Sequence, residues 1–194
     1  MVKILIADDH MIVRKGIVFL CRTYCKTNEI HEVEKGSELM SALKLNSYTH
    51  LILDLVLVDG QAIKIIPAIR ALYPALSIMI FSAQPLEMYY GPLSKYGITH
   101  FVAKHQPELD TLVALRQFIN NLPQPGGHKF NRASSNLSAR EVEVVNYLLN
   151  GYKNCEIAEQ MHVTRATVSV YIKRIRNKTG AKNVIQLKQW ASDF

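Results

Sequence analysis

Cysteine is scarce in this sequence, and long apolar runs are missing. Its three cysteines, Cys21, Cys25 and Cys155, are too few and too unevenly spaced for a disulfide framework, and we expect Cys21 and Cys25 to be small core residues. No apolar stretch approaches the roughly 20 residues that a bilayer crossing needs. The first apolar stretch, residues 2–7, is too short for a signal peptide and runs into charged residues. We therefore expect a cytoplasmic protein.

Acidic residues are scarce in the last third of the chain. Residues 1–122 hold 12 Lys+Arg and 11 Asp+Glu, whereas residues 123–194 hold 11 Lys+Arg and only 5 Asp+Glu. Most of the formal net charge of +7 therefore lies in the C-terminal part, and a polyanionic partner would bind there. The hydrophobic content of 48% is that of an ordinary globular protein, and 194 residues allow one large domain or two small ones.

One segment interrupts every regular pattern. Pro123-Gln124-Pro125-Gly126-Gly127 and the polar residues 131–136 continue neither a helix nor a strand. We therefore predict an N-terminal domain at residues 1–122, a linker at 123–136 and a C-terminal domain at 137–194.

The N-terminal part alternates short apolar runs with segments of helical spacing. Runs that are apolar throughout and alternate with helices indicate a parallel sheet covered on both faces. The predicted fold is a flavodoxin-like (βα)5 α/β domain. The predicted strands are residues 2–7, 29–34, 50–53, 76–81 and 100–103, and the predicted helices are 12–20, 38–45, 62–72, 87–96 and 109–119.

Polar side chains follow four of these runs. Asp8 and Asp9 follow the first, and Asp54, Ser82 and Lys104 follow the third, fourth and fifth. Because the carboxyl ends of parallel strands share one edge of the sheet, these residues should converge in one crevice. Clustered carboxylates repel one another unless a cation neutralises them, and hard oxygen ligands suit Mg²⁺. We therefore expect a divalent cation at this edge.

These motifs resemble those of the response-regulator receiver domains over residues 1–122. The resemblance rests on Asp8-Asp9, on Asp54 between two leucines, on Ser82-Ala83 and on Lys104 three residues after Phe101. It implies that Asp54 is the phosphoacceptor, with Lys104 and Ser82 assisting the phosphoryl transfer. It also implies a Mg²⁺ ion held by Asp9, Asp54 and the carbonyl of Val56, with Asp8 acting through water, and a conformational switch made by Ser82 and Phe101.

The sequence departs from that family pattern outside the acidic cluster. Val58 stands where most receivers have proline, Ala62 replaces a common glycine, and His100 stands where glycine is usual. Gly91-Pro92 falls inside the predicted fourth helix, where proline removes a backbone donor and clashes with the preceding turn. We predict that this helix is short, broken or begins only at Pro92.

The C-terminal part predicts four helices. Ser138 and Glu141 have the spacing of a capping box, and Leu137 with Val142 has that of a hydrophobic staple. This first helix should stop at Gly151. A second should begin near residue 154, a third should be capped by Thr164, and a fourth should begin near residue 183.

The third of these helices divides into two faces. Val168, Tyr171, Ile172 and Ile175 form an apolar stripe. The opposite face is small and cationic, so the helix could lie in the major groove of DNA. On charge and spacing alone, a solvated face of a small helical bundle explains the pattern equally well. The opposite face contains Ala166, Val170, Lys173 and Asn177, flanked by Ser169 and Arg174.

Residues 137–190 resemble the LuxR/NarL-type helix-turn-helix, through residues 137–141, 156–158 and 164–168. The resemblance implies base contacts by Ser169, Val170 and Lys173. It also implies dimer contacts on the last helix, for which Val184, Gln186 and Lys188 are the candidates. Phosphate contacts would come from Thr164, Arg165, Thr167, Arg174 and Lys178.

Together these patterns predict a DNA-binding response regulator of a two-component system. A sensor histidine kinase would phosphorylate Asp54, and phosphorylation would control formation of a homodimer and regulation of transcription. Such a protein catalyses only its own phosphoryl transfer and dephosphorylation, so it is not an enzyme acting on external substrates. One alternative is a transcription factor whose receiver is never phosphorylated. Another is an Asp-nucleophile phosphohydrolase, against which the missing Asp-x-Asp segment argues.

Overall fold

The computed structural model describes residues 2–27, 29–124 and 137–192. By their contacts these residues form two compact units. The first holds a β-sheet and its helices, and the second holds the four C-terminal helices together with Glu87–Leu93. From residue 125 onward, the predicted linker lies outside the described residues.

The first unit contains the predicted parallel sheet. Five strands lie in the order β2-β1-β3-β6-β7, and every neighbouring pair is parallel. Ala7 is paired with Leu53, and Leu53 with Ile80, so the strands end at nearly the same level. The (βα)5 prediction is confirmed. The strands are β1 (Ile4–Ala7), β2 (Ile30–Val33), β3 (His50–Leu53), β6 (Ser77–Ser82) and β7 (His100–Ala103).

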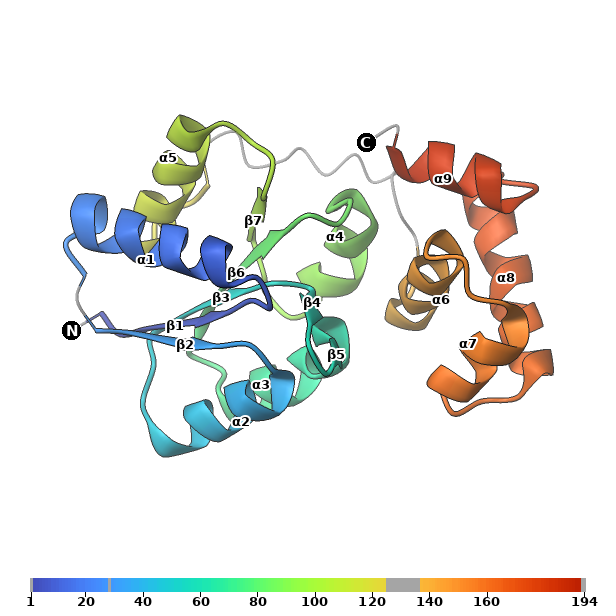
Figure 1. Cartoon of the computed structure of the whole chain (residues 1–194), viewed down its shortest axis with the longest axis horizontal. Helices are drawn as coiled ribbons and strands as arrows, with labels where there is room; N and C mark the ends of the chain where they lie inside the picture. Colours follow the sequence, from blue (N-terminus) through green and yellow to red (C-terminus); the bar gives the residue numbers. More distant parts are fainter. Residues whose placement is uncertain (1, 28, 125–136, 193–194) are drawn as a thin grey trace. The chain divides into compact units, whose positions relative to one another are not determined.

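Helices cover both faces of this sheet (Figure 1). α1 (Met11–Cys25) and α5 (Glu108–Ile119) lie on one face, and α2 (Gly36–Leu45) and α3 (Ile66–Leu72) lie on the other. The strands β1 and β3 are buried throughout because their successive side chains point to opposite covered faces, whereas the edge strand β2 is half-buried or exposed. On the α1 and α5 side, the core includes Ile4, Ile6, Ile52, Met79, Val102, Ile17, Cys21, Leu115 and Phe118.

Two features of the loop after β3 were not predicted. β4 (Val56–Leu57) and β5 (Gly60–Gln61) form a small antiparallel hairpin. The helix predicted at residues 62–72 is divided into a 3₁₀ turn, η1 (Ala62–Lys64), and α3. The division coincides with Pro67, which lacks a backbone donor and disfavours helical geometry in the residue before it.

The same loop caps α2. Asp59 accepts hydrogen bonds from the backbone N–H of Gly36 (2.6 Å) and of Ser37 (2.9 Å). Burial alone would raise the Asp59 pKa, but these bonds outweigh it and hold the pKa below its usual value. The approach is close, because a Cβ at Gly36 would lie 3.2 Å from Cδ1 of Ile65. The first turn of α2 is therefore tied to the loop that follows the acidic strand end.

α4 (Glu87–Ser94) is a short helix with Pro92 inside it. The prediction of a short helix is confirmed, and a start at Pro92 is wrong, because the helix begins at Glu87. Met88, Tyr89 and Leu93 are all buried. Burial of its apolar side chains compensates for the hydrogen bond that Pro92 cannot donate.

The second unit contains the four predicted C-terminal helices. The predicted capping box is present, since Ser138 and Glu141 each bond the backbone of the other. Thr164 caps α8 by accepting from the backbone N–H of Thr167 (3.1 Å). Gly180 ends α8 in the left-handed region, at φ 74°. The helices are α6 (Ala139–Leu149), α7 (Asn154–Gln160), α8 (Arg165–Thr179) and α9 (Val184–Ser192).

An ion pair links α6 to α8. The Glu141 carboxylate is buried and lies 2.7 Å from the Lys178 ammonium. Burial would raise the Glu141 pKa, but the bonds from Lys178 and Ser138 outweigh it, so the pKa lies below its usual value. The carboxylate therefore stays charged at neutral pH.

Cys21 is a core residue as predicted, and Cys25 is half-buried and packs against the same core. Cys21, Cys25 and Cys155 are all free thiols. Cys21 is buried in the core, where burial raises its pKa to about 12, so its thiol is protonated and unreactive at neutral pH. Within the described residues, no helix has the length and apolar character that a membrane crossing requires.

We predict that acidification destabilises the first unit through His50. This side chain is buried beside Phe118, and burial lowers its pKa below the ordinary 6.5, with Coulombic repulsion from His100 in the same direction. The unfolded chain therefore takes up the proton first, and stability should fall as the pH drops below about 6.5. Urea unfolding between pH 7.5 and 5 measures this slope.

The matched variants are His50→Gln and His105→Gln. His105 is exposed, so its replacement should leave the slope unchanged, whereas His50→Gln should flatten it. Equal slopes in the wild type and His50→Gln would show that His50 does not cause the acid sensitivity.

Candidate functional site

The sheet brings four of the predicted polar residues into one cluster. Asp8 and Asp54 directly follow the neighbouring strands β1 and β3, Ser82 is the last residue of β6, and Lys104 directly follows β7. Backbone bonds fix these strand ends, because Asp54 N–H donates to Ala7 O (2.8 Å) and Lys104 N–H donates to Ser82 O (2.9 Å). The convergence predicted from the strand pattern is therefore present.

Lys104 lies between two buried carboxylates. Its ammonium is 2.6 Å from Asp54 Oδ2 and 2.7 Å from Asp8 Oδ2. Burial alone would lower the Lys104 pKa, but both carboxylates stabilise the ammonium and raise the pKa above its usual value. Burial raises the Asp8 pKa, while the bond from Lys104 partly offsets that rise. Lys104 is therefore held in the charged form.

The other Asp54 oxygen accepts neutral donors. Oδ1 accepts the Ser82 hydroxyl (2.5 Å) and the backbone N–H of Leu55 (2.6 Å). Asp54 is only 4% exposed, so these bonds replace the water that a carboxylate normally holds. One carboxylate thus has its two oxygens directed at two different groups of donors.

Asp9 and His10 lie at the more open rim. His10 is exposed, and its Nδ1 lies 2.5 Å from Asp9 Oδ1. Asp8, Asp9, His10 and Asp54 each offer one ligand atom, and these four atoms lie within 4.8 Å of one another. Three carboxylates against one ammonium leave an excess of two negative charges. The donor set therefore fits a hard divalent cation.

Two residues beside the cluster were not predicted. The Arg14 guanidinium donates to the backbone O of Asp8 (2.6 Å), which ties α1 to the acidic pair. Gln124 bonds both backbone groups of Phe101, accepting from N–H (3.0 Å) and donating to O (2.9 Å). It thereby covers the free edge of β7, next to the predicted switch residue, whose ring is buried. Neither contact can be inferred from spacing in the sequence.

Val56 also lies next to the cluster. It begins β4, two residues after Asp54, and its backbone N–H is 3.4 Å from Asp54 Oδ1. The metal role of its carbonyl and the switch role of Phe101 stay predictions.

In the second unit, α8 has the predicted two faces. Val168 and Ile175 are fully buried, and Tyr171 and Ile172 are half-buried. Val170 is 48% exposed although it is apolar. The side chains on the opposite face are exposed to solvent, as predicted. They are Ala166, Ser169, Val170, Lys173, Arg174 and Asn177.

Some of the residues predicted to contact DNA form hydrogen bonds or ion pairs within the protein. Ser169 Oγ donates to Arg165 O (3.0 Å), and the Thr164 and Thr167 hydroxyls bond each other (2.9 Å). Lys178 pairs with Glu141, so a phosphate would compete with a carboxylate for it. The structure also places Arg176, Asn154 and Asn183 beside Ser169, in a pocket that helical spacing did not reveal.

Comparison with known proteins agrees with both units. The family model described as "Response regulator receiver domain" matches residues 4–116. The family model described as "Bacterial regulatory proteins, luxR family" matches residues 135–191. The chain belongs to the response regulators. Its receiver domain is the first matched region, and its DNA-binding domain is of the LuxR type.

Individual relatives extend over nearly the whole response regulator. The Fimbriae Z protein of Salmonella typhimurium strain LT2 is 29% identical over 206 residues, covering 97% of this chain and 95% of that protein. The solved complex of the two-component response regulator RcsB with DNA is 26% identical, with a TM-score of 0.82 and 98% coverage of each chain. A structure of two RcsB dimers bound to two parallel DNAs is 25% identical, with a TM-score of 0.78 and 98% coverage of each chain.

We predict strong energetic coupling between Lys104 and Asp54. Lys104→Met leaves two buried carboxylates without their ammonium, which should lower the free energy of unfolding of the receiver domain by ~1–3 kcal/mol. Asp54→Asn removes one of those charges, so the double variant should be more stable than the sum of the two single effects. Urea unfolding in EDTA at pH 7 measures all four proteins. Additive effects would contradict a shared ion cluster.

Proposed function

We propose that the response regulator accepts a phosphoryl group on Asp54 from a sensor histidine kinase, in a reaction that requires Mg²⁺. The observation that carries this proposal is the cluster at the strand ends, where Asp54 contacts both Lys104 and Ser82. A nucleophilic carboxylate that lies beside an ammonium and a hydroxyl suits phosphoryl transfer, which depends mainly on positioning and electrostatics.

In the proposed reaction, an Asp54 carboxylate oxygen attacks the phosphorus of the kinase's phosphohistidine. A new O–P bond forms, the N–P bond breaks, and its electron pair stays on the imidazole nitrogen of the kinase. Lys104 neutralises charge on the phosphoryl oxygens, because its ammonium already lies 2.6 Å from Asp54. Asp9, Asp54 and the Val56 carbonyl would hold Mg²⁺, with Asp8 acting through water. When bound, this ion neutralises further charge on the transferred group.

The new dianion supplies the driving force for a switch. Ser82 now donates to Asp54 and would donate to a phosphoryl oxygen instead, which moves the end of β6 inward. Phe101 lies on the neighbouring strand β7, where it is paired with Ile80 of β6. Movement at Ser82 would therefore change the space that the Phe101 ring occupies.

We further propose that the regulator binds duplex DNA through α8. Ser169, Val170 and Lys173 would contact base edges, because they are exposed on the face opposite the buried stripe. The RcsB structures support this proposal, since those relatives are described in complex with DNA. Phosphate contacts would come from Thr164, Arg165, Thr167, Arg174 and Lys178.

The DNA-bound form would be a homodimer, as the description of the RcsB dimers supports. On α9, Val184 is 41% exposed, and Gln186 and Lys188 are also exposed, so all three are accessible to a second copy. Pairing two weakly binding domains on two half-sites raises affinity through the linkage of the two contacts.

The phosphorylation test uses Mg²⁺ and a small acyl phosphate as donor. Intact-mass measurement of the wild type should show the gain of one phosphoryl group, and Asp54→Ala should show none. Addition of EDTA should abolish the gain, because the carboxylates would repel the incoming dianion. Ser82→Ala is the matched control and should still gain the group, since Asp54 remains. A folded wild type that gains nothing would favour the alternative of a receiver that is never phosphorylated.

The DNA test compares two cationic residues of α8. Lys173→Ala should weaken binding and relax base preference, whereas Arg165→Ala should weaken binding to all sequences alike. The wild type should show a steep salt dependence, and loss of one phosphate contact should reduce the log-log slope by about 0.9. Gel retardation at several salt concentrations measures both effects. Unchanged retardation in both variants would mean that α8 is not the helix that reads the groove.

A further inference from the structure

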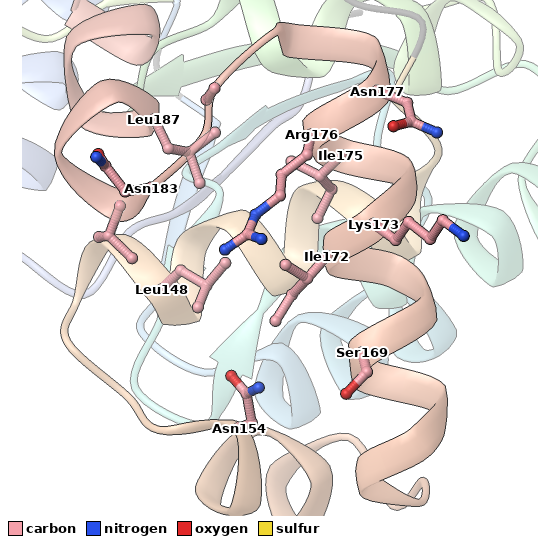
Figure 2. A pocket seen from close by; sticks show the side chains of 12 residues that line it. Leu148, Asn154, Ser169, Ile172, Lys173, Ile175, Arg176, Asn177, Asn183 and Leu187 are labelled. Carbon is pink, nitrogen blue, oxygen red and sulfur yellow. The ribbon is translucent and has the colours of Figure 1, made fainter.

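A pocket of about 500 Å³ lies within the DNA-binding domain (Figure 2). It is formed by the end of α6, the start of α7, residues 169–177 of α8 and the start of α9. Its volume is within the range of sites that bind small organic molecules. The pocket lies entirely inside one compact unit.

The floor of this pocket is apolar. Leu148 and Leu187 are buried, and Ile172 is half-buried. Figure 2 shows the Arg176 side chain extending from α8 into the pocket, with its guanidinium between Leu187 on one side and Leu148 and Ile172 on the other. Lys173 and Asn177 also border the pocket, but their side chains point away from it.

Arg176 has no carboxylate with which to pair. No aspartate or glutamate lines the pocket, and across the described residues no ion pair includes this guanidinium. A guanidinium prefers to donate two parallel hydrogen bonds to a carboxylate or phosphate. Asn154 adds an amide group at the rim. The polar side of the pocket therefore presents hydrogen-bond donors and the positive charge of Arg176, which no carboxylate neutralises.

We propose that this pocket binds a small organic anion, with one carboxylate or phosphate group on an apolar ring or chain. The anionic group would bind Arg176, and the apolar body would cover Leu148, Ile172 and Leu187. An inorganic anion would leave that floor exposed to water, and a DNA backbone phosphate would use only the rim. An apolar body attached to the anion satisfies both parts of the lining.

Occupancy of the pocket would also affect DNA binding. Ser169 borders the pocket and is one of the proposed base-reading residues, so a bound anion would place negative charge beside the DNA face of α8. This consequence rests on the proposed function, whereas binding of the anion does not. Anion and DNA would then weaken each other's affinity by the same factor.

The test uses 3-phenylpropionate as probe, with the full-length, isotope-labelled protein observed by NMR. The Arg176 side-chain N–H signal and the methyl signals of Ile172 and Leu187 should shift saturably. Acetate has the anion without the apolar body, and 3-phenylpropanol has the body without the anion. Each should bind at least about tenfold more weakly, because each engages only half of the lining.

Arg176→Gln and Arg174→Gln form the matched pair of variants. Arg176→Gln should weaken probe binding roughly tenfold or more, because it removes a charge-assisted bidentate contact. Arg174→Gln removes a charge two residues away on the same helix, outside the pocket, and should leave probe affinity unchanged. Thermal unfolding, monitored by the fluorescence of Trp190 on α9, the single tryptophan in the chain, shows that both variants remain folded.

Absence of saturable shifts in the folded wild type, or equal probe binding by both variants, would overturn the proposal. It would also be overturned if the probe does not bind while Arg176→Gln lowers the salt slope of DNA binding by about one contact. That result would make Arg176 a backbone phosphate contact. If the probe binds as expected but leaves DNA retardation unchanged, the pocket stands and the assignment of Ser169 to base contact fails.

Discussion

The ion cluster around Lys104 is the constraint on which the receiver site depends. Two carboxylates at neighbouring strand ends, Asp8 and Asp54, are buried almost completely and would repel each other strongly without the ammonium between them. The parallel order of β1, β3, β6 and β7 places all of these groups at one edge. The resulting cluster keeps an excess of negative charge, and its donor set fits a hard divalent cation. The sheet therefore sets the chemistry of the site before any partner is present.

The separation of buried apolar side chains from exposed charged ones also explains the two faces of α8. Val168 and Ile175 hold the helix against its unit, and that packing leaves Lys173 and Arg174 exposed. The ends of the helix are fixed by Thr164 and by the left-handed Gly180. A helix that is anchored on one side and capped at both ends presents its outer face in a defined orientation, which recognition of a groove requires.

The local spacing of apolar and polar residues predicted most of the helices and strands. It did not predict the contacts between residues that are far apart in the sequence. The runs at residues 50–53 and 100–103 are strands with the predicted bounds, because burial on both faces requires continuous apolar sequence. The β4–β5 hairpin was missed since two-residue strands have no detectable period. The cap of α2 by Asp59 joins residues 23 positions apart, and nothing in the spacing relates them. The pocket at Arg176 likewise depends on how α9 packs beside α8, which the periodicity of either helix does not contain.

The positions of the acidic residues determine which cations of the DNA-binding domain remain unpaired at its surface. On α6, Glu141 pairs with Lys178, and Glu143 pairs with Arg140. On α7, the Glu156 carboxylate accepts from the backbone N–H of Lys153 and so stabilises a helix start. These three carboxylates are thereby engaged within the protein, whereas Glu159 is exposed near Thr164 and Arg165 at the start of α8. On the outer face of α8, Lys173 and Arg174 are exposed and enter no ion pair among the described residues, so their charge is available to attract a polyanion.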